Sequence, residues 1–342
     1  MKKYVVLALT LAFAILIAAC AAPTPVPPPP ATAVPAPTAV PTPAAYVPKA
    51  GELGSADKPF VMTFVPSGDT GKIAKAGQGI ADLVSKQTGW AYKIEVGTSE
   101  AASIEAMGGN KAQVGFLNTF AIILAKAKYD IDVALVNQRI YIAIAIDPDK
   151  DLTGKITPYY KAEFLTKVGS GIKTYADLKG KSFCFTSAGS TSGNIVPRII
   201  LKANGIDPDK DMKSTFAGGH DKAALAVYQG DCDAGVTFVD TLTDQSLKLY
   251  EKFPDIATKV TAFGISDRIP NDGVQFVKGL DPRVRDATVK ALTAVAADPA
   301  GKQLLKDLYN IDGFEVAGYD KYYKPFEDIL KKAGVDASAY VK

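Results

Sequence analysis

The chain has 342 residues, and its 39 Lys and Arg nearly balance its 36 Asp and Glu, giving a formal net charge of +3 at pH 7. This balance, with no basic stripe along the sequence, argues against nucleic acid as a partner. About 290 residues follow the N-terminal leader, enough for two domains of ordinary size with a core in each.

The first twenty residues have the pattern of an export signal. Lys2 and Lys3 precede an apolar run, Tyr4 to Ala19, which is too short and too sharply ended for a good membrane-spanning helix. The run leads to Cys20 through small residues, which resembles the lipobox of lipoproteins, whose cysteine thiol accepts a diacylglycerol. We therefore expect a lipoprotein signal peptide over residues 1–20, lipidation at Cys20, and an extracytoplasmic chain anchored to the cell membrane by lipid. The alternative is an ordinary secretory signal in which Cys20 is incidental.

A proline-rich segment comes next. Residues 21–50 hold 11 of the chain's 22 prolines, and the remainder is mostly Ala, Thr and Val. This composition cannot bury a core and favours an extended, polyproline-like chain of about 3.1 Å per residue. We expect residues 21–54 to be a tether between the anchor and a folded module.

Strands and helices then alternate, which favours an α/β domain with a mostly parallel sheet. The expected strands are Phe60–Val65, Tyr92–Val96 and Val114–Leu117. The expected helices end at about Thr88, start at about Glu100, and cover Thr119–Ala127.

A second lobe is expected after the apolar stretch Ile140–Ile146, which is predicted to be a crossing strand. The polar stretch 147–172 is predicted to be a surface insertion. The further expected elements are a short helix and turn at 174–180, strands at 182–185, 214–217 and 234–238, a helix at 221–229, a returning strand near 260–265, and helices at about 282–297, 299–309 and 320–333. The predicted lobes are 55–145 plus 267–342, and 146–266.

Two cysteines remain in the exported module, Cys184 and Cys232. Export allows a disulfide between them, and two buried thiols are the alternative. The sequence has no CxxC motif or Cys/His cluster, so we expect no metal and no cofactor.

The segment Phe185–Asn194 is the most informative candidate for a binding site in the sequence. It contains Ser190, Thr191 and Ser192 between two glycines and leads from a strand into an apolar helix. Backbone N–H groups at a helix start, together with three hydroxyls, form a cradle for an anion. Helix capping is the plainer alternative, but it needs one hydroxyl and explains neither the others nor both glycines.

The only histidine, His220, stands at a second helix start after a glycine turn. Its ring could donate a hydrogen bond to an oxyanion, and a bound anion would favour the charged imidazole. A purely structural role is the alternative. A nucleophile elbow is not supported, since Gly189 and Gly193 bracket Thr191 rather than a serine. A P-loop is not supported either, because Tyr175 stands where that motif requires a glycine.

These motifs resemble the phosphate/phosphite/phosphonate substrate-binding family of ABC importers, of which the PhnD proteins are the best-known members. The similar segments are Gly189-Ser190-Thr191-Ser192-Gly193 with Pro197-Arg198, Gly218-Gly219-His220-Asp221 with Leu225-Ala226-Val227, residues 173–182, and Ile269-Pro270-Asn271-Asp272. They occur in the family's order. The resemblance covers about residues 58–310 and is strongest between 173 and 274.

The resemblance implies a two-lobed type II periplasmic-binding-protein fold, with two α/β domains joined by two crossing strands. It also implies roles for individual residues. The hydroxyls and amides that hold the phosphonate oxygens fall on Ser190, Thr191 and Ser192, and the histidine that joins them falls on His220. Two acids that can face a ligand amine fall on Asp240 and Asp272, and a tyrosine of the crossing strand falls near Tyr141.

One position departs from the family pattern. A first-lobe strand often ends in a tyrosine that touches the phosphonate, and Leu117 takes its place here. Asn118 and Thr119 open the next helix and are expected to donate instead. Ser67 and Thr70 are further candidates in the first turn.

The two acids have a physical consequence, because carboxylates near an anion cost energy unless a cation or proton lies between them. Asp240 and Asp272 therefore indicate an aminoalkyl ligand, or a carboxylate that accepts a hydrogen bond from a protonated ligand oxygen. The alternative is that both are surface or helix-capping residues.

The sequence thus predicts a monomeric, non-enzymatic binding protein. It would close two lobes on a phosphonate, phosphite or phosphate and dock on an ABC permease in the membrane. The alternatives are a receptor for another small ligand such as a sulfonate, nitrate or thiamine precursor, a lipoprotein that signals to a membrane sensor, or a secreted esterase using Ser190 or Ser192.

Overall fold

The computed structural model describes residues 46–337. The predicted signal peptide, Cys20 and most of the predicted tether lie outside these residues. Tyr46 packs its ring against Phe60 and Trp90 and accepts a hydrogen bond from the Trp90 indole through its backbone oxygen. The end of the predicted tether therefore lies against the folded body. Within the described residues, no helix combines the length and the apolar character needed to cross a membrane.

The first sheet has the strand order β14-β4-β13-β3-β1-β2, and β5 pairs with β4 at its end. β1, β2 and β3 are parallel, whereas β13 and β14 run antiparallel to their neighbours. The strands are β1 (Phe60–Phe64), β2 (Tyr92–Val96), β3 (Val114–Leu117), β4 (Asp132–Ile140), β5 (Ile156–Thr157), β13 (Gly273–Phe276) and β14 (Gly313–Val316).

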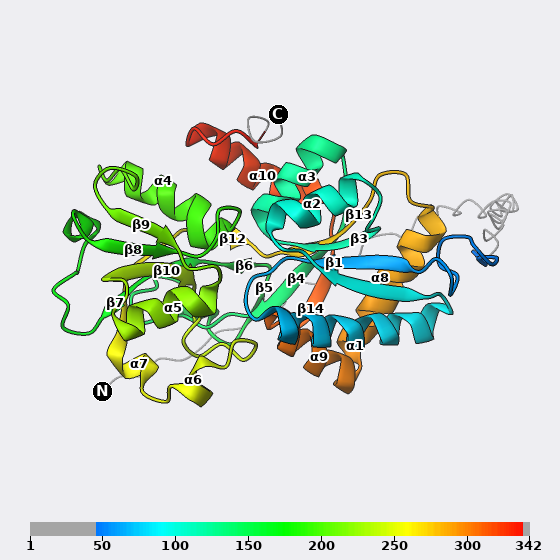
Figure 1. Cartoon of the computed structure of the whole chain (residues 1–342), viewed down its shortest axis with the longest axis horizontal. Helices are drawn as coiled ribbons and strands as arrows, with labels where there is room; N and C mark the ends of the chain where they lie inside the picture. The colour runs from blue at the N-terminus through cyan, green and yellow to red at the C-terminus, as the bar shows by residue number, and fades with distance from the viewer. Residues whose placement is uncertain (1–45, 338–342) are drawn as a thin grey trace, which may run out of the picture. The chain divides into compact units, whose positions relative to one another are not determined.

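Helices cover both faces of this sheet (Figure 1). One face carries α1 (Thr70–Thr88), α8 (Pro282–Ala297) and α9 (Pro299–Tyr309), and the other carries α2 (Glu100–Gly108), α3 (Thr119–Tyr129) and α10 (Tyr319–Lys332). The helix starts follow from the sequence, since the side chains of Asp69, Ser99 and Asn118 accept backbone N–H groups of the first turns. Proline occupies the first position of both α8 and α9, where its missing N–H costs nothing.

The second sheet has the order β11-β7-β10-β8-β9. Its strands are β7 (Ala162–Lys167), β8 (Ser182–Phe185), β9 (Lys213–Phe216), β10 (Ala234–Phe238) and β11 (Val260–Ile265), and its helical segments are η2 (Tyr175–Leu178), η3 (Thr191–Ile195), α4 (Val196–Ala203), α5 (His220–Gln229), α6 (Leu249–Lys252) and α7 (Ile256–Lys259). A short helical turn, η1 (Lys150–Leu152), precedes β5. Cys184 and Cys232 form a disulfide that ties β8 to the start of β10.

The two sheets are joined by a pair of short strands, β6 (Tyr159–Tyr160) and β12 (Ile269–Pro270), which run antiparallel between them (Figure 1). The predicted fold of two α/β lobes joined by two crossing strands is therefore observed.

Two predictions about this part of the chain are wrong. β4 ends at Ile140, so Ile140–Ile146 is not a strand, and Ile142 and Ile146 are 41% and 44% exposed. The stretch 147–172 is not a surface insertion, because it contains β7, which lies inside the second sheet between β10 and β11. The predicted returning strand is β11, an edge strand of that sheet, and β12 makes the return.

Candidate functional site

The three hydroxyls singled out in the sequence lie in the interior. Ser190, Thr191 and Ser192 are 5%, 1% and 2% exposed. The Ser190 Oγ accepts the Gly193 N–H at 3.1 Å and caps the helical segment η3. Gly193 is needed here, because a Cβ at this position would come within 1.9 Å of the Thr186 hydroxyl. The segment therefore brings hydroxyls and the N-terminus of a helix to one buried point.

The start of α3, which belongs to the first sheet, lies directly opposite. The Phe120 N–H donates to the Thr191 Oγ1 at 2.9 Å, and that hydroxyl donates to the Asn118 Oδ1 at 3.3 Å. The Asn118 Oδ1 also accepts the Ala121 N–H at 3.0 Å. Helix starts from both sheets thus converge on Thr191, and their partial positive charges favour an anion between them.

His220 adds a donor to the same point. Its Nδ1 accepts the Phe238 N–H at 3.2 Å, and its Nε2 lies 3.3 Å from the Ser190 Oγ. Burial lowers the pKa of His220 to about 3, and the nearby Arg139 also lowers it. Without a ligand the ring is therefore neutral at pH 7 and carries its proton on Nε2.

This tautomer bears on the esterase alternative. A serine nucleophile needs an imidazole nitrogen that accepts its proton, while an acid holds the other nitrogen. Here the Nδ1 of His220 is taken by a backbone N–H, and Nε2 holds the proton. The arrangement suits donation to a bound oxygen rather than activation of Ser190.

Tyr160 and Asp272 complete the polar end of the site. The buried Tyr160 hydroxyl, at the end of β6, interacts with the side chains of Ser192, Thr119 and Thr191. Burial, followed by the charge of Asp272, raises the Tyr160 pKa, so the hydroxyl remains a donor. The Asp272 Oδ1 accepts the Thr119 N–H at 3.3 Å, and burial raises the Asp272 pKa to about 7.

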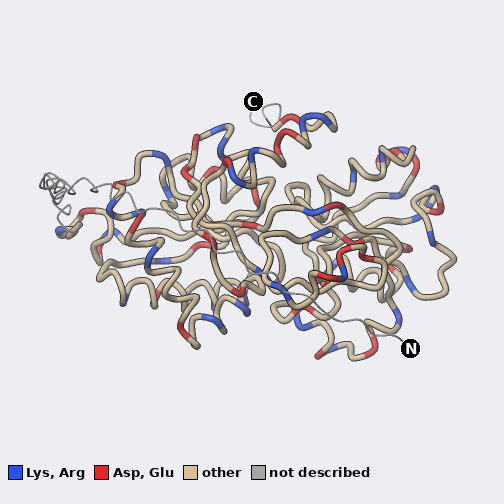
Figure 2. Tube along the Cα trace, turned by 180° about the vertical axis from the view of Figure 1, so that it is seen from behind, with Lys and Arg blue, Asp and Glu red and all other residues tan. Residues whose placement is uncertain are grey.

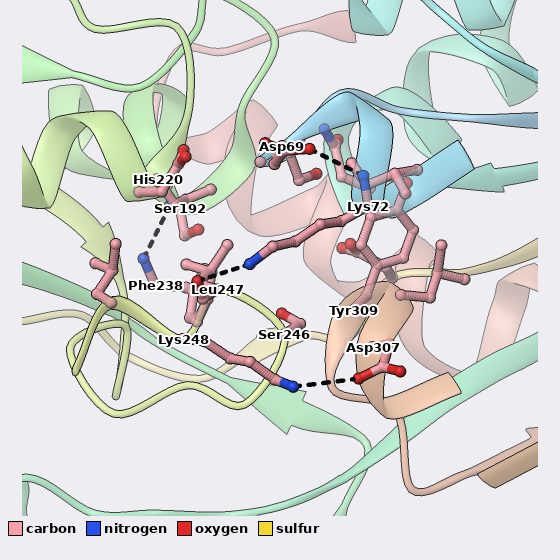
Figure 3. A pocket seen from close by; sticks show the side chains of 18 of the residues that line it. Asp69, Lys72, Ser192, His220, Phe238, Ser246, Leu247, Lys248, Asp307 and Tyr309 are labelled. Atoms are coloured by element: carbon pink, nitrogen blue, oxygen red, sulfur yellow. Dashed lines mark hydrogen bonds and ion pairs between the residues drawn. The ribbon is translucent and has the colours of Figure 1, made fainter. Parts of the chain in front are cut away.

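These groups line one end of a cavity of about 140 Å³ between the two sheets (Figure 3). Six of the residues expected to bind ligand line the cavity: Ser190, Thr191, Ser192, His220, Asn118 and Asp272. Ser67, one of the two further candidates, lines it as well. The lining does not include Thr119, Thr70, Tyr141 or Asp240. Thr119 contacts the site only indirectly, because its backbone N–H donates to the Asp272 side chain, which lines the cavity.

Tyr141 lies elsewhere, because its strand ends one residue earlier. Its hydroxyl donates to the Asp147 Oδ2 at 2.5 Å, away from the cavity. Tyr160, on the connecting strand β6, lines the cavity instead. The sequence offered a weak signal for it, since two adjacent tyrosines stand just before a strand, but they fell in the stretch taken for an insertion.

Asp240 is buried beside the cavity rather than in its wall. Its Oδ1 lies 3.8 Å from the Arg139 guanidinium, and burial raises its pKa to about 7. Arg139 itself pairs with Asp244 at 3.0 Å and stacks over the Phe238 ring at 5.2 Å. Arg139 lines the cavity and was not predicted, since nothing around it in the sequence resembles a motif.

Basic and acidic residues are interspersed along the described chain, as Figure 2 shows. Among residues 46–337 there is no group of three or more His, Cys, Asp or Glu side chains placed to hold a metal ion. The site is a donor-rich pocket between two helix starts, with the Arg139 guanidinium in its wall.

The chain is similar to several known proteins. The phosphate-import protein PhnD of Mycolicibacterium smegmatis is 29% identical over 199 residues, which cover 55% of this chain and 57% of that protein. A probable phosphite-binding protein of an ABC transporter of Prochlorococcus marinus is 28% identical over 170 residues, covering 48% and 55%. The chain thus spans a little over half the length of these curated relatives.

Solved structures share the fold. The Prochlorococcus marinus PhnD1 in complex with methylphosphonate has a TM-score of 0.66 at 20% identity and covers 80% of this chain and 98% of its own. A binding protein of a phosphonate ABC transporter from Pseudomonas aeruginosa has a TM-score of 0.68 at 18% identity, covering 82% and 92%. The model of the family described as "ABC transporter, phosphonate, periplasmic substrate-binding protein" matches residues 62–323. The chain therefore belongs to the family of periplasmic substrate-binding proteins of phosphonate ABC transporters.

Proposed function

We propose that this chain captures a small phosphorus oxyanion, namely a phosphonate, phosphite or phosphate, and presents it to an ABC permease. The observation that supports this best is the meeting of the Ser190–Ser192 hydroxyls with the start of α3 and a neutral His220 donor. Donors at two helix starts, with the Arg139 guanidinium in the same cavity wall, suit an anion because they stabilise its negative charge.

Asp272 favours phosphorus over sulfur. A carboxylate beside an anion is tolerated when the anion carries a proton to donate, and phosphate, phosphite and phosphonates keep such a proton near neutral pH. Sulfate does not, so binding it would require Asp272 itself to take up a proton. The relatives named for phosphate import and phosphite binding, and the one solved with methylphosphonate, are consistent with this class.

Closure of the two lobes is the proposed mechanism. The β6–β12 pair is the connection about which they would move. Contacts between the lobes lie at the cavity: the Asn118 side-chain amide donates to the Gly189 backbone oxygen at 3.4 Å, and the backbone N–H of His220 donates to the Ser67 backbone oxygen at 3.3 Å. A ligand that contacts both lobes would stabilise the closed form.

We further propose that the chain acts as a monomer outside the cytoplasm, tethered by a lipid on Cys20. The lipobox-like sequence and the proline-rich segment after it support this. The closed form would then dock on the permease within reach of the tether.

Calorimetric titration of the chain with phosphate, phosphite, methylphosphonate, 2-aminoethylphosphonate and sulfate tests the proposal. Submillimolar binding of at least one phosphorus compound, with no binding of sulfate, is expected. The Ser190→Ala/His220→Ala double variant should lose at least a hundredfold in affinity, since two donors to a charged ligand are removed. Ser214→Ala, whose hydroxyl bonds to the Pro208 oxygen away from the cavity, is the matched control.

If the chain bound a sulfonate, nitrate or thiamine precursor and no phosphorus compound, the proposed phosphorus ligand would be wrong. Hydrolysis of a nitrophenyl ester that disappears in the double variant would contradict the transport role altogether.

A further inference from the structure

A hairpin of the first lobe lies beside the two strands that connect the lobes. It follows β4, and its two arms are joined at Tyr141, whose backbone N–H donates to the Lys155 oxygen at 2.9 Å and whose backbone oxygen accepts the Gly154 N–H at 2.9 Å. The chain then continues into β5, which pairs with the end of β4. We call residues 141–155 the hinge hairpin; the first sheet holds it at both ends.

Asp149 of the hinge hairpin is bonded at the second-lobe end of both connecting strands. Its Oδ2 lies 2.7 Å from the Lys161 Nζ, and its two carboxylate oxygens accept the Arg268 guanidinium at 2.9 and 3.0 Å. Lys161 is the first residue after β6, and Arg268 is the last residue before β12. One carboxylate carried by the first lobe therefore spans the point about which the lobes would turn.

The inner part of this network is buried. The Lys161 and Asp147 side chains are 3% and 0% exposed, and the Lys161 Nζ lies 2.8 Å from the Asp147 Oδ1. The Asp147 Oδ2 accepts the Tyr141 hydroxyl. Hydrogen bonds from Arg268 and Lys161 hold the pKa of Asp149 well below its usual range, so this carboxylate is charged at pH 7. Because a buried ammonium that loses its partners is costly, the network resists a change of hinge angle that would separate these groups.

The sequence of this turn occurs a second time, which supplies a comparison within the chain. Ile-Asp-Pro-Asp-Lys-Asp covers residues 146–151 and again residues 206–211. In each copy the N–H of the second aspartate donates to the Oδ1 of the first, at 2.9 and 3.0 Å. The second aspartate is Asp149 in one copy and Asp209 in the other, where it is 62% exposed and pairs with Arg198 of its own lobe. The two copies share the turn, and they differ in whether this aspartate spans the hinge.

We propose that the hinge hairpin is a brace that holds the lobes at the closed angle, and that Asp149 is the positioning residue through which it acts. This inference rests on the lobe closure of the proposed function. Neither the hinge hairpin nor its partners Lys161 and Arg268 line the cavity. The brace thus stabilises the closed form from outside the binding site. It raises the closed fraction before ligand arrives, and the apparent affinity rises by the same factor.

The test measures the distance between the lobes without ligand. Lys75 on α1 and Lys222 on α5 are exposed and belong to opposite lobes, so spin labels attached after Lys75→Cys and Lys222→Cys report the hinge angle by pulsed electron resonance. The labelled chain should show mostly the short distance of the closed form. Asp149→Asn keeps the shape of the side chain and removes its charge, and it should move most of the population to longer distances.

Ligand affinity is the second readout. Calorimetric titration with methylphosphonate should show roughly a fivefold or larger loss in Asp149→Asn, equal to its loss of closed fraction. Asp209→Asn is the matched control, because it makes the same substitution in the same turn away from the hinge, and it should keep the distance and affinity of the wild type. Arg268→Gln, at the exposed end of the network, makes the same test if Asp149→Asn does not fold.

An unchanged distance distribution in Asp149→Asn would overturn the inference, and so would a wild-type chain that is mostly open without ligand. A loss of affinity with no change in distance would overturn it as well, since the effect would then lie in the cavity. If no phosphorus compound bound while Asp149→Asn still lengthened the distance, the proposed ligand would be wrong and the brace would stand.

Discussion

At the scale of single residues, the site combines buried neutral donors with one largely buried guanidinium, that of Arg139. His220, Tyr160 and the Ser190–Ser192 hydroxyls all carry protons to donate at pH 7, because burial disfavours the charged imidazole and the charged phenolate. The Thr191 hydroxyl now donates to the Asn118 Oδ1, and the His220 Nε2 lies 3.3 Å from the Ser190 Oγ, so a ligand would compete for donors that bond within the site. An oxyanion supplies several acceptor oxygens at once.

Tyr160→Phe removes a single donor, the Tyr160 hydroxyl, and so tests whether that hydroxyl binds the ligand. The variant should bind the phosphorus ligand roughly tenfold to a hundredfold more weakly, since one hydrogen bond to a charged group is lost. Its melting temperature should change little, because the ring stays in place. Tyr159→Phe is the control: this neighbour packs edge-on against Tyr322, and it should bind as the wild type does. Equal affinities in Tyr160→Phe and wild type would remove Tyr160 from the site.

Glu163 gives a prediction about pH. It is 2% exposed in β7, and burial raises its pKa to about 8, with the nearby Asp240 adding to the shift. The folded chain therefore keeps a proton that the unfolded chain releases above its ordinary pKa of about 4.3. This contribution to stability is fully present below that value and is lost as the pH rises toward 8.

Glu163→Gln should accordingly reduce the fall in unfolding free energy between pH 5 and pH 8 by one to a few kcal/mol. Urea denaturation at the two pH values measures it. The exposed Glu251→Gln should leave the fall unchanged. If the unfolding free energy of Glu163→Gln fell as steeply with pH as that of the wild type, Glu163 would be ionised in the folded chain.

At the scale of elements, the sequence predicted most helices and strands to within a few residues, because capping residues and apolar periodicity mark them. The Ser190–Ser192 cradle and His220 were also found, since each lies at a marked strand-to-helix junction. The wrong predictions concern residues whose exposure is the opposite of what their polarity suggests. Ile142 and Ile146 are apolar yet exposed, whereas Glu163 and Thr166 are polar yet buried in β7.

Local pattern cannot reveal such reversals, since they depend on distant partners. The buried Lys161, just before β7, is neutralised by Asp147 at 2.8 Å and Asp149 at 2.7 Å. Thr166 donates to the Asp233 oxygen at 2.8 Å. Tyr160 was missed for the same reason, because it belongs to a stretch that looks solvent-exposed when read alone.

The disulfide between Cys184 and Cys232 yields a prediction at this scale. It closes a loop across 48 positions of the second sheet, and a cross-link of that span stabilises by about 2–4 kcal/mol. Reduction should lower the melting temperature while ligand affinity stays within about twofold, since neither cysteine lines the cavity. The Cys184→Ala/Cys232→Ala variant should melt at the temperature of the reduced chain and not respond to reductant. Unchanged melting of the wild type on reduction would contradict the prediction.

At the scale of the whole molecule, the proposed lipid anchor and the folded body are separate functions of one chain. Cys20→Ala should release the protein from membranes into the soluble fraction and leave its ligand affinity unchanged. Fractionation of cells that express the wild type and the variant, followed by titration of each, measures both properties. Membrane association of Cys20→Ala equal to that of the wild type would show that the cysteine is not the anchor.

The central claim is that a phosphorus oxyanion is held between the two lobes, and hydrogen exchange tests it most directly. Addition of saturating methylphosphonate should protect the backbone amides of residues 118–121, in the first lobe, and of residues 190–196, in the second, because both helix starts face the ligand. Sulfate at the same concentration should protect neither. Protection of one segment alone, or equal protection by sulfate, would contradict the account.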